Sequence, residues 1–245
     1  MAAVSHPGAS RSLGGPRRAV YVFEWPVRIV HWTIVATLIV LSFTGYYLHH
    51  PFLGGQGAAG HPGFALGDFR FVHEVTAFVF TAAVLARVYW AFMGNRYAHW
   101  RALMPITRKQ RDDARAMLLY YILVRRHPPR TIGHNPLAGM AYLSLYALFL
   151  LSILTGFGLY AWVGRIPAWQ TLFGWTYGLV PIEQLRLVHF LLMFLFGAFA
   201  IHHVYSAVLI DIEERNGELS SIVTGYKAIP LEWDVPSEGH EEAEA

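Results

Sequence analysis

The stretch RLVHFLLMFLFGAFAIHH, residues 186–203, decides the fold class of this chain. Residues 187–210 contain no Asp, Glu, Lys or Arg, and a helix of that length can cross the hydrocarbon core of a bilayer. The stretch nevertheless contains His189, His202 and His203. Ionisable side chains inside a membrane-spanning helix are costly to bury, so their presence indicates a functional site.

Helical geometry separates these three histidines. His189 and His203 are fourteen residues apart, which places them about 40° apart around the helix and about 21 Å apart along its axis. One side of the helix therefore presents two imidazoles, one near each membrane surface. His202 lies roughly 140° around the helix from His189 and faces elsewhere. We therefore predict His203, rather than His202, as a functional residue.

The composition is that of an integral membrane protein. The 245 residues are 55% hydrophobic and only 14% charged, whereas a soluble domain has about 25% charged residues. The chain contains no cysteine, which excludes disulfides, zinc–thiolate sites and cysteine-ligated iron–sulfur clusters within it. The net charge of +3 combines a basic first half with an acidic tail, so it does not indicate nucleic-acid binding.

Apolar runs predict an all-α integral membrane protein, a bundle of four transmembrane helices in a single domain. The helices are expected at about residues 29–48, 71–93, 137–161 and 185–210. Residues 1–27 are expected to form a mobile tail without a cleaved signal peptide, and residues 211–245 a solvated acidic tail. Within the connection 94–136, residues 108–126 place basic ends around an apolar patch, which predicts an interfacial helical segment on the cytoplasmic side.

Basic residues set the expected orientation. The segment through Arg28 has four arginines and the connection 94–136 has nine basic residues. The positive-inside rule therefore places this connection and both termini in the cytoplasm.

The orientation assigns a depth to each membrane histidine. His73 begins the second helix and lies near the outer surface, as does His189; we call these two the outer pair. His31 begins the first helix and lies near the cytoplasmic surface with His203; we call these two the inner pair. Facing histidines on neighbouring helices are typical of bis-histidine haem b in a helical bundle. A single membrane histidine often makes only a helix–helix hydrogen bond, but four at matching depths favour two haem sites. His49 and His50 are expected at the loop or surface.

Three arginines are candidates for contacts with haem propionates. Arg87 is fourteen residues after His73, so it shares that face of its helix near the inner pair. A place near a quinone head group, or snorkelling of the side chain to the cytoplasmic surface, are the alternatives. Arg28 and Arg186 flank the two levels of histidines and serve equally well as ordinary positive flanks.

The glycines near the histidines have two possible roles. Gly45, Gly156 and Gly197 would let a macrocycle approach the backbone, or would simply allow close packing of helices.

Four stretches resemble the b-type cytochrome subunit of membrane-bound NiFe uptake hydrogenases. They are VRIVHWTIVATLIVLSFTGYYL (27–48), RVYWAFMGNRYAHW (87–100), RLVHFLLMFLFGAFAIHH (186–203) and IEERNGELSSIVTGYK (212–227). The first and third are shared in outline with formate dehydrogenase gamma subunits, whereas the last favours the hydrogenase family. One departure is Phe194, where the family pattern favours Trp at a packing position.

The resemblance implies an electron-transfer subunit of a hydrogen:quinone oxidoreductase in the bacterial cytoplasmic (inner) membrane. Its partners would be the hydrogenase small subunit with its iron–sulfur chain and the large NiFe subunit, which oxidises hydrogen outside the membrane. Electrons would pass by way of two haem b groups, ligated by the outer and inner pairs, to a membrane quinone, and this chain would not itself be catalytic toward hydrogen. The alternatives are a cytochrome b serving another dehydrogenase, of formate or thiosulfate type, and a histidine-based transporter.

Overall fold

The computed structural model describes residues 15–52, 64–127, 129, 132–133, 135–164 and 166–233, except for the side chains of residues 64 and 65. Four long helices make up most of the described chain: α1 Trp25–His49, α2 Phe64–Met93, α5 Pro136–Val163 and α8 Ile182–Glu214. All four are long and apolar enough to cross a membrane. The prediction of a four-helix, all-α membrane protein is therefore confirmed, with helices that extend up to seven residues beyond the expected ends.

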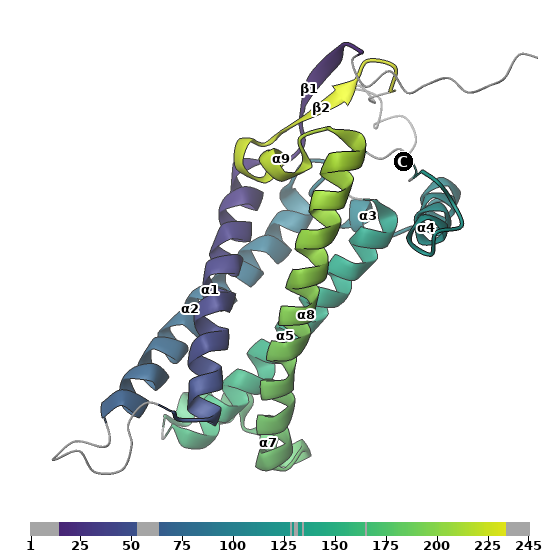
Figure 1. Cartoon of the computed structure of the whole chain (residues 1–245). Helices are drawn as coiled ribbons and strands as arrows, with labels where there is room; N and C mark the ends of the chain where they lie inside the picture. The colour runs from purple at the N-terminus through teal and green to yellow at the C-terminus, as the bar shows by residue number, and fades with distance from the viewer. Residues whose placement is uncertain are drawn as a thin grey trace, which may run out of the picture.

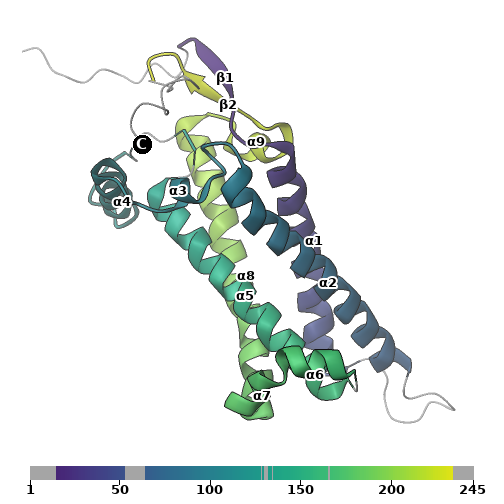
Figure 2. The ribbon, with the colours of Figure 1, turned by 180° about the vertical axis from the view of Figure 1, so that it is seen from behind.

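The four helices form an elongated bundle in which α1 packs chiefly on α2 and α5 on α8. Two views of the ribbon, from the front and from behind, show the short helices α6 (Pro167–Phe173) and α7 (Trp175–Leu179) at one end of the bundle (Figures 1 and 2). The strands β1 (Arg17–Tyr21) and β2 (Tyr226–Pro230) stand at the opposite end with α9 (Glu218–Thr224). We call this the sheet end.

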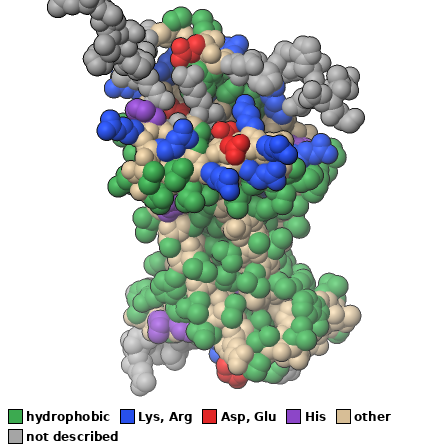
Figure 3. All heavy atoms as spheres, turned by 90° about the vertical axis from the view of Figure 1, so that its right-hand side faces the viewer, with side chains coloured by type: hydrophobic (Ala, Val, Ile, Leu, Met, Phe, Trp, Pro, Cys, Tyr) green, Lys and Arg blue, Asp and Glu red, His purple; other side chains and the backbone are tan. Residues whose placement is uncertain are grey.

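A packed apolar layer fills the middle of the bundle. Its buried residues come from all four long helices: Ile34, Phe80, Ala83, Val84, Phe149, Leu192 and Phe196. On α8, Leu192 and Phe196 lie between His189 and His203, so this layer separates the two predicted levels of histidines. The outside of the bundle is apolar as well, and Lys and Arg side chains gather toward the sheet end of the face in Figure 3. This distribution is that of a bundle surrounded by lipid.

The helix α4 (Arg108–Tyr121) lies beside the bundle rather than within it (Figure 1). Thr107 begins it with a reciprocal capping box, in which its hydroxyl accepts from the Gln110 backbone and the Gln110 side chain accepts from the Thr107 backbone. It is strongly amphipathic, and its apolar continuation is exposed, with Leu123 91% accessible. The helix forms where the sequence predicts an interfacial segment, but it ends at Tyr121, five residues before the end of the predicted range.

Two segments near opposite ends of the chain pair with each other, which the sequence did not predict. The strand β1 runs antiparallel to β2, with Arg17 opposite Pro230 and Tyr21 opposite Tyr226. We call β1, β2 and α9 together the terminal clasp. The expectation of a mobile N-terminal tail and a solvated C-terminal tail is therefore wrong for residues 17–21 and 211–230.

Specific polar contacts explain why the terminal clasp folds. The Arg17 guanidinium donates to the carbonyls of Glu214 and Arg215 at the C-terminal end of α8. Lys227 is 2% exposed and forms an ion pair with Glu218 at 2.5 Å. The charges of this segment are thus used within the fold rather than solvated.

Candidate functional site

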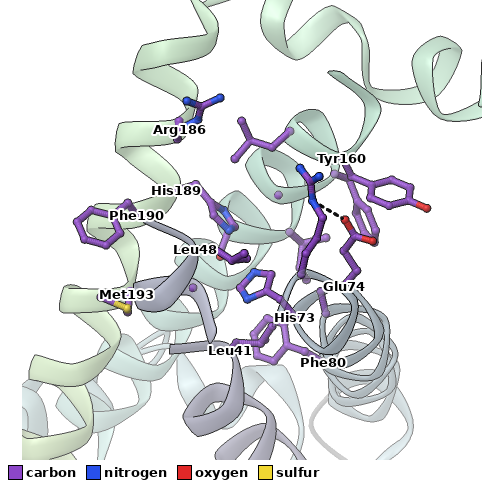
Figure 4. Close-up of a pocket in the computed structure, with 18 of the residues that line it drawn as sticks. Leu41, Leu48, His73, Glu74, Phe80, Tyr160, Arg186, His189, Phe190 and Met193 are labelled. Atoms are coloured by element: carbon purple, nitrogen blue, oxygen red, sulfur yellow. Dashed lines mark ion pairs between the residues drawn. The ribbon is translucent and has the colours of Figure 1, made fainter. Parts of the chain in front are cut away.

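The outer pair faces a cavity of about 790 Å³ between the four long helices, toward the end that carries α6 and α7. In the close-up, His73 projects from α2 and His189 from α8 into this cavity (Figure 4). Their ring centres are 6.4 Å apart and the ring planes make an angle of 76°. The volume is in the range of cavities that bind organic cofactors, roughly 300–1,000 Å³.

The inner pair repeats this spacing at the sheet end. The ring centres of His31 and His203 are also 6.4 Å apart, with an angle of 59° between the planes. Metal–imidazole bonds are about 2 Å long, so two imidazoles that bind one metal from opposite sides have ring centres roughly 6 Å apart. Both pairs therefore fit a single metal between them. Among the described residues there is no group of three or more His, Asp or Glu side chains that could hold a metal ion.

Threonine side chains contact both histidines of the outer pair. The Oγ1 of Thr44 on α1 lies 2.8 Å from His73 Nδ1, and the Oγ1 of Thr155 on α5 lies 3.0 Å from His189 Nδ1. With Nδ1 engaged in this way, the Nε2 atom of each ring is left to bind a metal.

Glycines give the outer histidine rings their space. A Cβ atom on Gly45 would lie 3.2 Å from His73 Cε1, and one on Gly156 would lie 2.9 Å from His189 Cε1. Nothing lies within 4 Å of the corresponding position on Gly197. Gly45 and Gly156 therefore make room for the histidines themselves.

The surroundings of the inner pair are different. The hydroxyl of Tyr142 lies 3.2 Å from His203 Nδ1, and the Phe199 ring stacks on His203 with ring centres 5.8 Å apart. The Nδ1 of His31 is buried, and no hydrogen-bond partner for it is found in the described part of the chain. His202 is exposed, with its Nε2 3.5 Å from Ser206 Oγ.

The three candidate arginines have different environments. Arg186 is exposed and lines the outer cavity. Arg28 donates to the backbone carbonyl of Val223 in α9, at the sheet end. Arg87 is buried, with 7% of its surface exposed, and its Nη2 donates to Ala98 O at 3.2 Å.

The outer cavity also includes residues that sequence reasoning left out. His49 is exposed at the end of α1, as expected, but it also lines the cavity and stacks on Phe190 with ring centres 3.8 Å apart. Thr44 and Thr155 were not proposed as site residues. The signal that could have found them is the pair Thr-Gly, which occurs once in α1 and once in α5, at the depth of the outer pair.

The chain is similar to b-type cytochromes along most of its length. The profile of the family described as prokaryotic cytochrome b561 matches residues 22–225. A "Probable Ni/Fe-hydrogenase B-type cytochrome subunit" of Cupriavidus necator is 36% identical over 217 residues, which are 86% of this chain and 87% of that protein. A protein of the same name from Bradyrhizobium diazoefficiens is 36% identical over 221 residues, 89% of this chain and 88% of its own. The "Probable Ni/Fe-hydrogenase 1 B-type cytochrome subunit" of Escherichia coli K12 is 35% identical over 215 residues, 85% and 90% of the two chains. The chain belongs to the prokaryotic cytochrome b561 family.

Proposed function

We propose that this chain is the membrane subunit of a NiFe hydrogenase and transfers electrons from its partner to the membrane quinone pool. Membership in a b-type cytochrome family implies haem b, and the relatives are named as hydrogenase subunits. The four long apolar helices make the chain a multi-pass membrane protein.

One observation carries the proposal of two haem sites: two histidine pairs with the same 6.4 Å spacing lie at two depths of one bundle. The helix α8 contributes one histidine to each pair, and its two histidines are about 21 Å apart along the axis. Bound haem supplies a one-electron iron centre whose potential the protein tunes. His73 and His189 bind and orient the outer group, while His31 and His203 do the same for the inner one.

The apolar layer between the pairs supports transfer across the membrane. Phe80, Phe149 and Phe196 are each less than 9% exposed and fill the space between the two levels. An apolar layer of this kind keeps water and ions out of the space between the two sites.

Charge distribution gives the proposed orientation. The helix α4, with four basic residues, lies toward the sheet end (Figure 1), and Lys and Arg side chains gather toward that end of the surface (Figure 3). The positive-inside rule then places that end in the cytoplasm. The outer pair would then receive electrons from the iron–sulfur small subunit, which works with the large NiFe subunit outside the cytoplasmic membrane.

Absorption spectroscopy of the purified chain tests the two haem sites. The dithionite-reduced minus oxidised spectrum should show b-type haem, and a pyridine haemochrome assay should give two haems per chain. His189→Ala should remove one haem and His203→Ala the other, whereas the neighbouring control His202→Ala should keep both. Absence of a b-type band, or loss of haem in the control, would contradict the proposal.

Co-purification tests the partner. A hydrogenase subunit should bring down a partner that contains nickel and iron–sulfur clusters. A partner without nickel would instead indicate a cytochrome b of another dehydrogenase.

A further inference from the structure

Two threonines occupy equivalent places at the outer pair. Thr44 and Thr155 lie on the two helices that do not supply its histidines, and each directly precedes a glycine that accommodates the contacted ring. Each Oγ1 is within 3.0 Å of a histidine Nδ1. The proposed function assigns neither threonine a role.

The hydroxyl hydrogens fix the direction of these contacts. A threonine hydroxyl has one hydrogen and two acceptor lone pairs. Thr44 Oγ1 donates to Val40 O at 2.7 Å, and Thr155 Oγ1 donates to Leu151 O at 2.8 Å. With that hydrogen used on its own helix, each oxygen is free to accept from an Nδ1–H group.

The threonine contacts select one tautomer. Because each hydroxyl oxygen accepts at Nδ1, the hydrogen belongs on Nδ1 of His73 and of His189. This tautomer leaves the Nε2 lone pair of each ring for the iron.

We propose that Thr44 and Thr155 are positioning residues that set the tautomer, the ring orientation and the reduction potential of the outer site. An acceptor on Nδ1–H makes the imidazole a more basic ligand, and a more basic ligand favours ferric over ferrous iron. The two threonines thus hold the potential of the outer haem lower than it would be without them. This inference rests on the proposed function only in that His73 and His189 ligate a haem.

The inner pair supplies an internal reference for this inference. His31 Nδ1 is buried without a hydrogen-bond partner among the described residues, and His203 Nδ1 faces the phenol of Tyr142, which can donate or accept. Within the described ranges, neither inner histidine is hydrogen-bonded to a threonine. A change at Thr44 or Thr155 should therefore act on the outer haem alone.

Substitutions in the intact purified complex test the inference. Thr44→Val and Thr155→Val remove an acceptor but keep the shape of the side chain, and Thr44→Ser keeps the acceptor. The matched control is Thr37→Val, because Thr37 is buried on the same helix and its hydroxyl donates only to Thr33 O and Ile34 O. Haem content, potentiometric titration and low-temperature EPR of the low-spin ferric haems are measured for each protein.

Both haems should remain bound in the valine variants, since His73 and His189 themselves are unchanged and valine keeps the shape of the threonine side chain. The midpoint potential of the outer haem should rise in each valine variant. The rise should be about 59 mV or less, which for one electron is a change of about tenfold or less in the equilibrium constant for reduction. The midpoint potential of the outer haem should rise further in the double variant, because the two threonines contact different histidines. The outer EPR signal should change with ring orientation, while Thr44→Ser and Thr37→Val should match the unsubstituted protein.

Three results separate the possible failures. Two bound haems with unchanged outer potential and EPR signal in the double variant would overturn the inference and leave the proposed function intact. A shift in Thr44→Ser equal to that in Thr44→Val would show that packing, not the hydrogen bond, sets the potential, and would also overturn it. If the unsubstituted protein holds no haem at the outer pair, the proposed function itself fails.

Discussion

Arg87 is a cation buried inside a membrane-spanning helix. Its Nη2 donates to the carbonyl of Ala98, and its guanidinium lies 5.9 Å from the centre of the Tyr146 ring. No ion pair between Arg87 and a carboxylate is found within the described ranges. A buried guanidinium without a counter-charge is costly, and a haem propionate near the inner pair would supply one.

Arg87→Met should lower the midpoint potential of the inner haem. A nearby positive charge stabilises the added electron, so its removal favours the ferric state. A unit charge about 8 Å from the iron would contribute about 2 kcal/mol at an effective dielectric constant of about 20. Potentiometric titration of the purified complex measures it. Arg96→Met is the control, because Arg96 contacts Tyr97 in the following loop; equal shifts in the two variants would reject a specific role for Arg87.

The effect of replacing a glycine by alanine on haem binding should depend on how close the added methyl group comes to a histidine ring. Gly156→Ala places a methyl group 2.9 Å from His189 and should displace that ring, whereas Gly45→Ala, at 3.2 Å from His73, should have a smaller effect. Gly197→Ala meets nothing within 4 Å and should leave both haems unchanged. Haem content and the low-spin EPR signal give the order. A loss of haem in Gly197→Ala alone would show that the glycines serve the macrocycle rather than the histidines.

At the scale of elements, the terminal clasp holds the sheet end of the bundle together. Besides the Arg17 contacts, Arg28 donates to Val223 O and the Trp32 indole N–H donates to Ile222 O at 3.3 Å. Both side chains come from α1, next to His31. The terminal clasp therefore covers the helix that carries His31 of the inner pair.

Lys227→Met should loosen this clasp. The change leaves Glu218 without its partner at a largely buried position, and should cost about 1–3 kcal/mol, since the Glu218 side chain keeps some access to solvent. Amide hydrogen exchange should become faster in residues 216–230. Adding Glu218→Gln should restore part of the protection, and Arg108→Met, at an exposed position, should have no effect. Unchanged exchange in Lys227→Met would mean that backbone pairing alone holds the clasp.

The sequence predicted the long helices because length and hydropathy are local properties. It did not predict the clasp, because RRAVY (17–21) and YKAIP (226–230) are short and their pairing joins opposite ends of the chain. To predict the two histidine pairs, only the depth of each histidine in the membrane was needed, and that depth follows from counting residues along each helix. The contacts of Thr44 and Thr155 depend on how the neighbouring helix is rotated, and depth alone does not determine that rotation.

At the scale of the whole molecule, the two ends of the bundle differ in charge and in structure. Figure 3 shows Lys and Arg gathered toward the sheet end, with a long apolar surface beyond them. Basic residues of short loops are retained on the cytoplasmic side during insertion. An even number of spans then returns the C-terminal clasp to the side of the N-terminus, where β1 and β2 can pair. The pairing of the termini is thus itself an argument that both lie on one side.

The absence of cysteine makes this orientation directly measurable. Leu179, at the end of α7, is 74% exposed, and Leu231, just after β2, is 55% exposed. In spheroplasts, a membrane-impermeant maleimide should label Leu179→Cys, but should label Leu231→Cys only after the membrane is opened. Haem content of each variant, compared with that of the unsubstituted protein, confirms that the labelled chain is folded. The reverse pattern would place the sheet end outside, so that His31 and His203 would face the hydrogenase partner and the proposed direction of electron transfer would be inverted.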